Sequence, residues 1–204
     1  MTDCAAGPVW NEHEVAAGLR AGDEDAFEQV VRRYGGRLLA VARRLLRDEE
    51  DARDAVQDAL ISAFRGRERF EGGAQLGTWL HRIVVNASLM RLRTRRRRPE
   101  TPIEDLLPVF GEDGHPVARP QPDPPADEQV ERRELLLIVR AAVDELPEGY
   151  REVYLLRDVD ELSTEDAAAA LGITPNAVKI RLHRARQALV TLVRSQLTTP
   201  GSRR

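Results

Sequence analysis

The chain has 204 residues and a formal net charge of −3; 42% of its residues are apolar, 32% are charged and 4% are aromatic. That length suits one domain or two small ones, and the composition favours helices over a β-sandwich. No apolar run approaches the roughly 20 residues that cross a bilayer, and the N-terminus lacks a signal-peptide pattern. One cysteine and four scattered histidines have no metal-ligand spacing. We therefore expect a cytoplasmic protein with no membrane insertion, metal or cofactor.

Basic side chains gather in two places although the net charge is negative. The run RLRTRRRR fills residues 91–98, and no Asp or Glu follows Asp166. A phosphate backbone responds to such local clusters rather than to the total charge. The distribution therefore points to a nucleic-acid partner.

The spacing of apolar residues predicts a long helix over 23–48, DEDAFEQVVRRYGGRLLAVARRLLRD. Apolar positions recur at steps of three and four residues, which places them on one buried face. These positions are Phe27, Val30, Val31, Tyr34, Leu38, Val41, Ala42 and Leu45. The Gly35-Gly36 pair is expected to weaken the helix locally.

A second helix is predicted over 50–65, EDARDAVQDALISAFR. Its inward positions are Ala52, Ala55, Val56, Ala59, Leu60, Ala63 and Phe64. Its outward stripe consists of Asp54, Gln57, Asp58 and Ile61. Short polar side chains on one face suit a charged partner helix, because hydrogen bonds to ionised groups are stronger than neutral ones.

A loop and a third helix complete the first half of the chain. The stretch RFEGGAQLG at 69–77 contains three glycines and predicts a loop. The helical pattern resumes from Trp79 to Arg93. The inward positions are Leu80, Ile83, Val84, Ala87, Leu89 and Met90, and the outward ones are His81, Arg82, Asn86, Arg91 and Arg93.

Residues 99–127 contain eight prolines and more acids than bases. Helices do not run through that proline density, so the segment is predicted to link a domain at 11–98 to one at 128–195. Within it, IEDLLPVF at 103–110 is more apolar than a spacer requires. It either docks on another part of the protein or forms a local turn. The predicted fold class is all-α, with two small helical domains joined by a Pro-rich acidic linker.

The second domain is predicted to contain a helix-turn-helix. Helices over 128–145 and 149–158 precede LSTEDAAAALGITPNAVKIRLHRARQALVTLV. Ser163 suits an N-cap with Asp166 three residues later, and Leu171-Gly172 suits the end of that helix. Thr174-Pro175 suits the start of the next helix. Two helices joined by a tight turn containing Gly form this motif.

The last helix has a predicted core face and a basic face on a wheel of about 100° per residue. The core face is Val178, Leu182, Ala185, Leu189 and Leu192, and the opposite face is Asn176, Ile180, His183 and Gln187. Lys179 and Arg186 flank one side and Arg184 the other. Asn176, Lys179 and His183 suit base edges, Ile180 suits a thymine methyl group, and the arginines suit phosphates. The alternative is a basic face that only contacts solvent.

Three stretches resemble, in this order, an extracytoplasmic-function sigma factor of the sigma-70 family. They are EDARDAVQDALISAFR, FEGGAQLGTWLHRIVVNASLMRLRTRRR and LSTEDAAAALGITPNAVKIRLHRARQAL. The resemblance implies a factor that binds core RNA polymerase and directs transcription initiation at promoter DNA. It implies a region 2-like domain at 11–98 for polymerase binding and for −10 recognition and melting. It further implies a region 4-like domain at 128–195 for −35 recognition, and an anti-sigma protein as a probable partner.

The resemblance also assigns roles to single residues. Asp54, Gln57, Asp58 and Ile61 are expected to contact polymerase; the alternative is that the two acids pair with Arg53 or Arg65. Phe70, Gly72, Gly73, Ala74 and Asn86 are expected to form a pocket for a flipped −10 base, with Arg91 and Arg93 on the adjoining backbone. Glycines allow the close approach that such a pocket requires, and Asn86 supplies a donor and an acceptor. Trp79 is either a core residue or a stacking platform.

Two other functions are alternatives to this one. A helix-turn-helix regulator that binds duplex DNA without polymerase explains 128–195 but not the first half of the chain. An enzyme is not expected, because the sequence has no Ser/His/Asp or Cys/His set and no Gly-rich phosphate loop followed by Lys.

Overall fold

The computed structural model describes residues 10–70, 75–95, 102–108 and 128–198. The chain divides into two compact units, Met1–Arg96 and Arg97–Arg204, and each is described by itself. The described residues form helices and turns without any strand, which confirms the predicted all-α class. No described helix is both long enough and apolar enough to cross a membrane.

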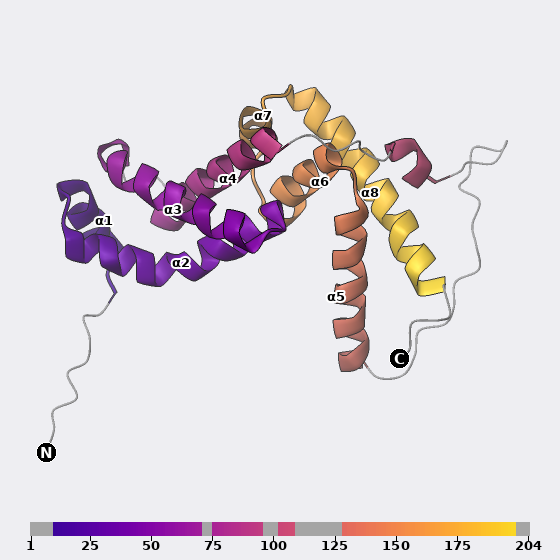
Figure 1. Ribbon diagram of the computed structural model, residues 1–204, viewed down its shortest axis with the longest axis horizontal. Coiled ribbons are helices and arrows are strands. Elements are labelled where there is room, and N and C mark those ends of the chain that lie inside the picture. The colour runs from indigo at the N-terminus through magenta and orange to yellow at the C-terminus, as the bar shows by residue number, and fades with distance from the viewer. Residues whose placement is uncertain (1–9, 71–74, 96–101, 109–127, 199–204) are drawn as a thin grey trace, which may run out of the picture. The chain divides into compact units, whose positions relative to one another are not determined.

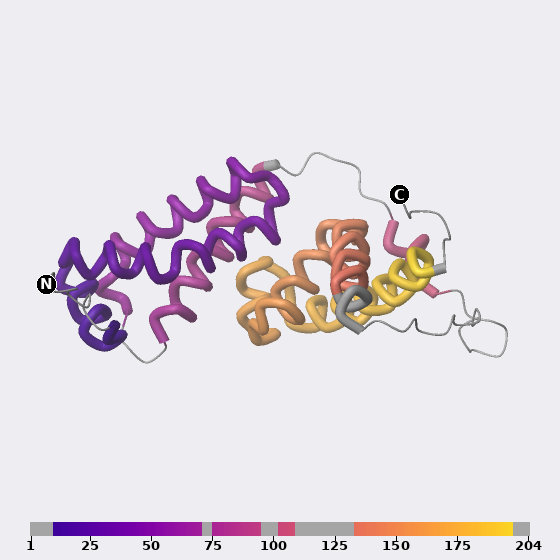
Figure 2. Tube along the Cα trace, turned by 90° about the horizontal axis from the view of Figure 1, so that it is seen from below, coloured from indigo at the N-terminus to yellow at the C-terminus, as the bar shows by residue number. Residues whose placement is uncertain are grey.

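The first unit is a helical bundle in which α2, α3 and α4 lie side by side (Figures 1 and 2). The short helix α1 packs on α2 and on the 3-10 turn η1. The elements are α1 (Glu12–Ala21), α2 (Glu24–Leu46), α3 (Glu49–Arg65), η1 (Arg67–Arg69) and α4 (Leu76–Arg95).

Helix α2 follows the predicted spacing and is continuous through Gly35-Gly36. The predicted local weakening concerns stability and stays a prediction. Asp23 begins the helix by accepting a hydrogen bond from the Asp25 amide at 3.0 Å. Of the eight predicted core positions, six are buried and Phe27 and Val31 are half-buried. The long apolar stripe explains why the two glycines do not break the helix, because tertiary packing outweighs helix propensity.

Helix α3 packs against both α2 and α4. Its buried stripe consists of the small residues Ala52, Ala55, Ala59 and Ala63. Small side chains let the neighbouring helices approach closely on both sides. The larger predicted inward residues, Val56, Leu60 and Phe64, are only half-buried. Phe64 packs edge-on against Phe27 of α2 at a ring distance of 5.1 Å.

Helix α4 begins at Leu76, three residues before the predicted start at Trp79. Its buried positions include Leu76, Val85 and Ser88, which the apolar pattern did not identify. The Ser88 hydroxyl donates to the Val84 carbonyl at 2.8 Å, which satisfies its buried oxygen. The prediction that Met90 lies inside is wrong, because its side chain is 69% exposed. The neighbouring residue Leu89, which was also predicted to lie inside, is buried.

Helix α1 was not predicted, although its ends carry ordinary helix signals. Asn11 accepts a hydrogen bond from the His13 amide at 3.1 Å, and Gly22 ends the helix in a left-handed conformation. Val15, Ala16 and Leu19 are buried. The helix therefore adds an apolar face to one end of the bundle.

The second unit is built around α8, which contacts α5, α6, α7 and η2. Helix α6 continues directly into a π-helical turn. Together the two elements correspond to the helix predicted at 149–158. The elements are η2 (Ile103–Leu106), α5 (Glu128–Glu145), α6 (Glu148–Tyr154), the π-helical turn (Leu155–Val159), α7 (Thr164–Leu171) and α8 (Pro175–Thr198).

The described part of the predicted linker, residues 102–108, does not extend freely from the unit. Its 3-10 turn η2 packs against α8, and the Ile103 side chain is buried. Of the two alternatives for IEDLLPVF, docking therefore applies to η2, residues 103–106. Residues 109 and 110 lie outside the described residues. The rest of the predicted linker, 99–101 and 109–127, also lies outside them.

Candidate functional site

The helix-turn-helix of the second unit consists of α7 and α8, and its turn has the predicted caps. The Ser163 hydroxyl oxygen accepts from the Asp166 amide at 3.0 Å. Gly172 ends α7 with φ of +68°, a conformation that glycine adopts at little cost. Thr174 Oγ1 accepts from the Ala177 amide at 3.1 Å. These bonds satisfy backbone donors at both helix starts and set the direction in which α8 leaves the turn.

The predicted faces of α8 are confirmed by burial. All five predicted core residues, Val178, Leu182, Ala185, Leu189 and Leu192, are buried. Asn176, Lys179, Ile180 and His183 are exposed, and Gln187 is half-buried. The exposed side chains lie within the first three turns of the helix, at the N-terminal end that enters a major groove in helix-turn-helix proteins. Ile180, 48% exposed, adds an apolar surface to this face.

The two arginines that flank this face are each next to a carboxylate. Arg186 donates from Nε and Nη2 to the two Asp158 oxygens at 2.8 and 2.7 Å. The hydrogen bond to Asp158 is the main cause that raises the pKa of Arg186 above its ordinary value. On the other side of α8, Arg184 Nη1 lies 3.8 Å from Glu104 Oε1 of η2. Both arginines remain exposed, so both can reach a phosphate.

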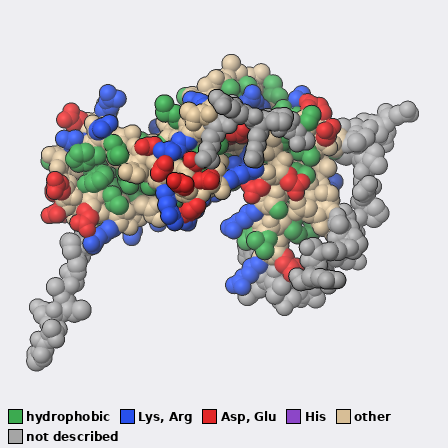
Figure 3. Space-filling model, viewed as in Figure 1, with side chains coloured by type: hydrophobic (Ala, Val, Ile, Leu, Met, Phe, Trp, Pro, Cys, Tyr) green, Lys and Arg blue, Asp and Glu red, His purple; other side chains and the backbone are tan. Residues whose placement is uncertain are grey.

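The outward stripe of α3 is accessible as predicted. Gln57, Asp58 and Ile61 are exposed, and Asp54 is half-buried. The partner of the two acids is neither Arg53 nor Arg65. Arg91 of α4 donates from Nη1 to Asp54 Oδ2 at 3.1 Å and from Nη2 to Asp58 Oδ2 at 2.7 Å. Arg53 instead pairs with Glu49 at 3.0 Å. Figure 3 shows the same interleaving of acidic and basic side chains on the visible face of the first unit.

Apart from Arg91, which bonds Asp54 and Asp58, the predicted −10 residues divide into three groups. Gly72, Gly73 and Ala74 lie outside the described residues. Phe70 is buried, and its ring centroid is 5.1 Å from that of Trp79. Its side chain therefore lies in the core beside Trp79. Trp79 is half-buried. This burial does not decide between a core residue and a stacking platform.

Asn86 and Arg93 form the third group and share one exposed face of α4. Seven residues are nearly two full turns, so the two side chains lie only about 20° apart around the axis. Met90 lies about 40° from Asn86 on the same face and is exposed. Sequence reasoning missed it as a candidate contact because its apolar character suggested the core. An exposed methionine beside an amide and a guanidinium offers a surface on which an unstacked base can pack.

The start of α4 is held by residues that sequence reasoning also missed. Glu12 Oε1 of α1 accepts from the Leu76 amide at 2.8 Å. Gly77 lies so close to α2 that a Cβ atom there would be 2.9 Å from Tyr34 Cε1. Burial, with a smaller contribution from Glu12, raises the pKa of Tyr34. The end of the glycine loop is therefore anchored to both α1 and α2.

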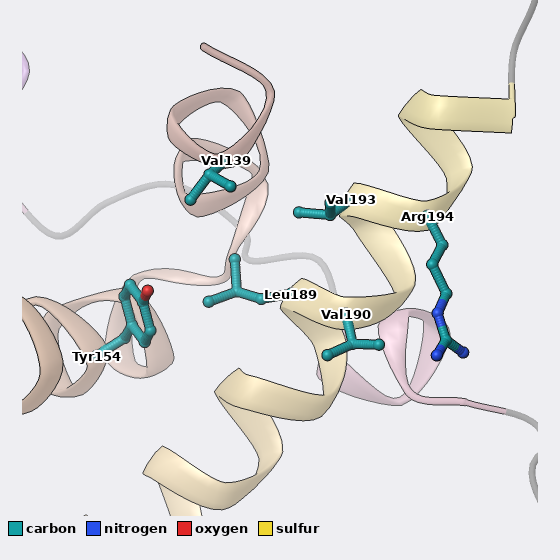
Figure 4. A pocket seen from close by; sticks show the side chains of 6 residues that line it. All are labelled: Val139, Tyr154, Leu189, Val190, Val193 and Arg194. Carbon is teal, nitrogen blue, oxygen red and sulfur yellow. The ribbon is translucent and has the colours of Figure 1, made fainter. Parts of the chain in front are cut away.

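An apolar hollow of about 330 Å³ lies between α5 and α8 (Figure 4). Val139 of α5 and Val193 of α8 face each other across it, with Tyr154 at one side. The neighbouring surface of α5 exposes Leu135, Leu136 and Leu137. Exposed apolar patches of this kind are typical of protein-binding surfaces. Among the described residues, no group of three His, Cys, Asp or Glu side chains is placed to hold a metal ion.

Two family models match the chain, and each match falls in a different unit. The model for sigma-70 region 2 matches residues 30–98, which include α3 and α4. The model for region 4 of sigma-70 matches residues 136–189, which include α7, the turn and the part of α8 up to Leu189.

Similar proteins of known identity cover nearly the whole chain. The ECF RNA polymerase sigma factor SigM of Mycobacterium tuberculosis (strain H37Rv) is 37% identical over 183 residues, covering 90% of this chain and 85% of that protein. The ECF RNA polymerase sigma-E factor of Escherichia coli K12 is 31% identical over 171 residues, covering 84% and 88%.

Solved structures agree with the sequence matches. CnrH, solved in complex with the cytosolic domain of CnrY, has a TM-score of 0.54 and 29% identity, covering 90% of this chain and 97% of that chain. The sigma factor RpoE of Bartonella quintana, solved with the anti-sigma factor NepR, has a TM-score of 0.52 and 28% identity, covering 82% and 96%. With the helix-turn-helix and the α3–α4 surface, these matches identify the chain as an RNA polymerase sigma factor of the ECF group, within the sigma-70 family.

Proposed function

We propose that this sigma factor attaches to core RNA polymerase through the outward stripe of α3 and directs initiation at promoters with a −10 and a −35 element. The domain at 11–98 binds polymerase and captures the opened −10 strand. The domain at 128–195 reads the −35 duplex, and residues 99–127 connect the two. The observation that carries the proposal is that one chain combines a polar stripe on α3 with a helix-turn-helix whose second helix has an exposed basic face.

The −35 contacts are proposed for α8. Asn176, Lys179 and His183 are suited to base edges because they are exposed within its first three turns. Ile180 packs against a thymine methyl group or a sugar. Arg184 and Arg186 hold phosphates on either side, which sets the register of the helix in the groove.

The −10 contacts are proposed for α4 and the preceding loop. Asn86 bonds the edge of an extruded base, and the loop at Gly72, Gly73 and Ala74 closes over that base. Arg93 holds the adjoining phosphate. The buried Phe70 packs on Trp79 of α4.

Further partners follow from the relatives. CnrH and the Bartonella RpoE were solved with CnrY and with the anti-sigma factor NepR, and we propose that this chain is also held by an anti-sigma protein. The apolar hollow between α5 and α8 is consistent with a protein partner on the second unit. Because polymerase and promoter DNA are its working partners, we propose that the protein acts in the cytoplasm.

Run-off transcription with core polymerase and a promoter library tests the proposal. We expect transcripts that start downstream of a shared −35/−10 pair. The double variant Asp54→Arg/Asp58→Arg is expected to lose core binding and remain folded, whereas Glu28→Arg/Glu68→Arg, with the same change of charge at two exposed acids of the first unit, is expected to keep it.

Absence of transcripts together with intact duplex binding would instead favour a regulator that works without polymerase. Core binding that survives the Asp54→Arg/Asp58→Arg change would refute the assignment of α3 as the polymerase surface.

A further inference from the structure

Arg91 of α4 is the centre of a charged cluster on α3. Its guanidinium bonds one oxygen each of Asp54 and Asp58, at 3.1 and 2.7 Å, and lies 3.9 Å from Asp51 Oδ1. The hydrogen bond to Asp58 is the main cause that raises the pKa of Arg91 above its ordinary value. Only 28% of the Arg91 side chain is exposed, so most of it is covered by this cluster and the helices around it.

The direction of Arg91 separates it from the other candidate DNA contacts on α4. Five residues of α-helix correspond to about 500°, so Arg91 lies about 140° around the axis from Asn86. Arg93 lies on the Asn86 face, about 20° from it. A DNA strand that follows Asn86 and Arg93 therefore lies on a different side of α4 from the guanidinium of Arg91.

The chemistry of the pair Asp54 and Asp58 explains why an arginine is needed here. The two carboxylates are one helical turn apart on α3, a spacing at which like charges repel. The guanidinium presents several N–H donors in a fixed plane and can bond both carboxylates at once. Each carboxylate gives Oδ2 to Arg91 and has Oδ1 as a further acceptor. Both acids are thereby held in one geometry before a partner arrives.

We infer that Arg91 is a positioning residue of the polymerase-binding surface, where it orients Asp54 and Asp58, and that it is not a −10 contact. This inference rests on the proposed function of α3. Fixing the two side chains in advance lowers the entropy cost of binding, because a partner need not immobilise them. Neutralising part of the cluster also lets two acids stand one turn apart without strong repulsion.

The test separates core affinity from −10 strand affinity in the full-length protein. Arg91→Met keeps a long side chain without charge, and Arg93→Met is the matched control two residues away. Core affinity is measured by competition with a labelled wild-type chain, and strand affinity with a single-stranded −10 oligonucleotide. We expect Arg91→Met to weaken core binding about fivefold and strand binding less than twofold, in line with the loss of one or two charge pairs. Arg93→Met is expected to weaken strand binding about fivefold and core binding less than twofold.

Two further variants distinguish positioning from a general loss of folding. Arg91→Lys retains a charge but not the planar fork, so it is expected to restore part of the core affinity. In an Asp54→Asn/Asp58→Asn background, Arg91→Met is expected to change core affinity no further. Thermal unfolding of each variant confirms that the first unit remains folded.

The inference is overturned if Arg91→Met leaves core affinity unchanged or raises it, or if its main effect is on strand binding. Its failure differs from a failure of the proposed function. If Asp54→Arg/Asp58→Arg abolishes core binding while Arg91→Met does not affect it, the α3 surface stands and only the role of Arg91 is wrong. If the double variant binds core normally, the α3 surface and the role of Arg91 are both wrong.

Discussion

Glu12 and Leu76 are 64 positions apart in sequence, yet the Glu12 carboxylate accepts a hydrogen bond from the Leu76 amide at 2.8 Å. Leu76 is the first residue of α4, so a side chain from α1 satisfies one of the free amides at the start of that helix. A carboxylate at this position also interacts favourably with the helix dipole. Helix α1 therefore helps to set where α4 begins and how the glycine loop ends.

Loss of this long-range cap is expected to weaken −10 recognition. Glu12→Ala should lower the free energy of unfolding by about 0.5–2 kcal/mol, the usual range for a lost N-terminal cap. Affinity for a −10 single strand should fall with it, because the start of α4 loosens beside the loop. Urea unfolding and oligonucleotide binding measure the two effects. Glu14→Ala, an exposed acid on the same helix, is the control and should change neither by much.

Asn86→Ala is expected to reduce discrimination at one −10 position while leaving core affinity unchanged. A side chain that bonds a base edge is worth about 1–3 kcal/mol of discrimination, so selectivity at that position should fall about five- to 150-fold. Competition among −10 oligonucleotides that differ at single positions measures this loss of selectivity. Unaltered selectivity at every position would show that Asn86 is not part of the base pocket.

Neutralising Asp158 is expected to strengthen duplex binding. In the free protein Asp158 bonds Arg186 through both oxygens, so Asp158→Asn makes the guanidinium available to phosphate. Arg186 then holds its phosphate without first giving up the Asp158 pair, so duplex affinity should rise by up to about fivefold, the usual worth of an exposed ion pair. Glu165→Gln removes the same charge from an exposed position on α7 and controls for the general electrostatic effect. Equal gains in duplex affinity in the two variants would contradict the prediction.

Two adjacent residues of α4 should differ sharply in their effect on stability. Leu89 is buried and Met90 is 69% exposed. Leu89→Ala is expected to cost about 2–5 kcal/mol of unfolding free energy, whereas Met90→Ala should stay within about 0.5 kcal/mol. Thermal or urea unfolding of the two variants tests this. If Met90→Ala proves as costly as Leu89→Ala, then Met90 is part of the core after all.

The pair Arg43–Glu49 gives one acid-dependent contribution to stability. Two bonds of 2.7 and 2.6 Å join the end of α2 to the start of α3, and the bond to Arg43 is the main cause that lowers the pKa of Glu49 below 4.5. A depressed pKa means that the contribution is complete above the unfolded pKa and is lost as pH falls through the folded one. Glu49→Gln should therefore be less stable than wild type near neutral pH. The gap should close as the solution becomes more acidic than the folded pKa of Glu49.

Urea midpoints measured across that pH range test the sign. Glu50→Gln retains the Arg43–Glu49 pair and serves as the matched control on the same turn. A gap between wild type and Glu49→Gln that widens with acid would show that the pair does not act through the charge of Glu49.

Local signals in the sequence determined most of the helices and the helix-turn-helix. The apolar spacing of α2 and α8, the cap at Ser163 and the turn at Gly172 each depend on residues within one or two turns, so they can be read without tertiary information. The same reasoning identified the exposed faces of α3 and α8.

Only the tertiary structure decided which charges meet. Arg91 with Asp54 and Asp58, Arg186 with Asp158, and Glu12 with the Leu76 amide all join elements that are distant in sequence. Periodicity places a side chain on a face of its own helix but does not say which helix packs beside that face. Met90 was misplaced for the same reason, since a Met at the edge of an apolar stripe is buried only if a neighbour covers it. The sequence therefore determined the candidate surfaces, and packing decided which of their charged groups are already paired in the free protein.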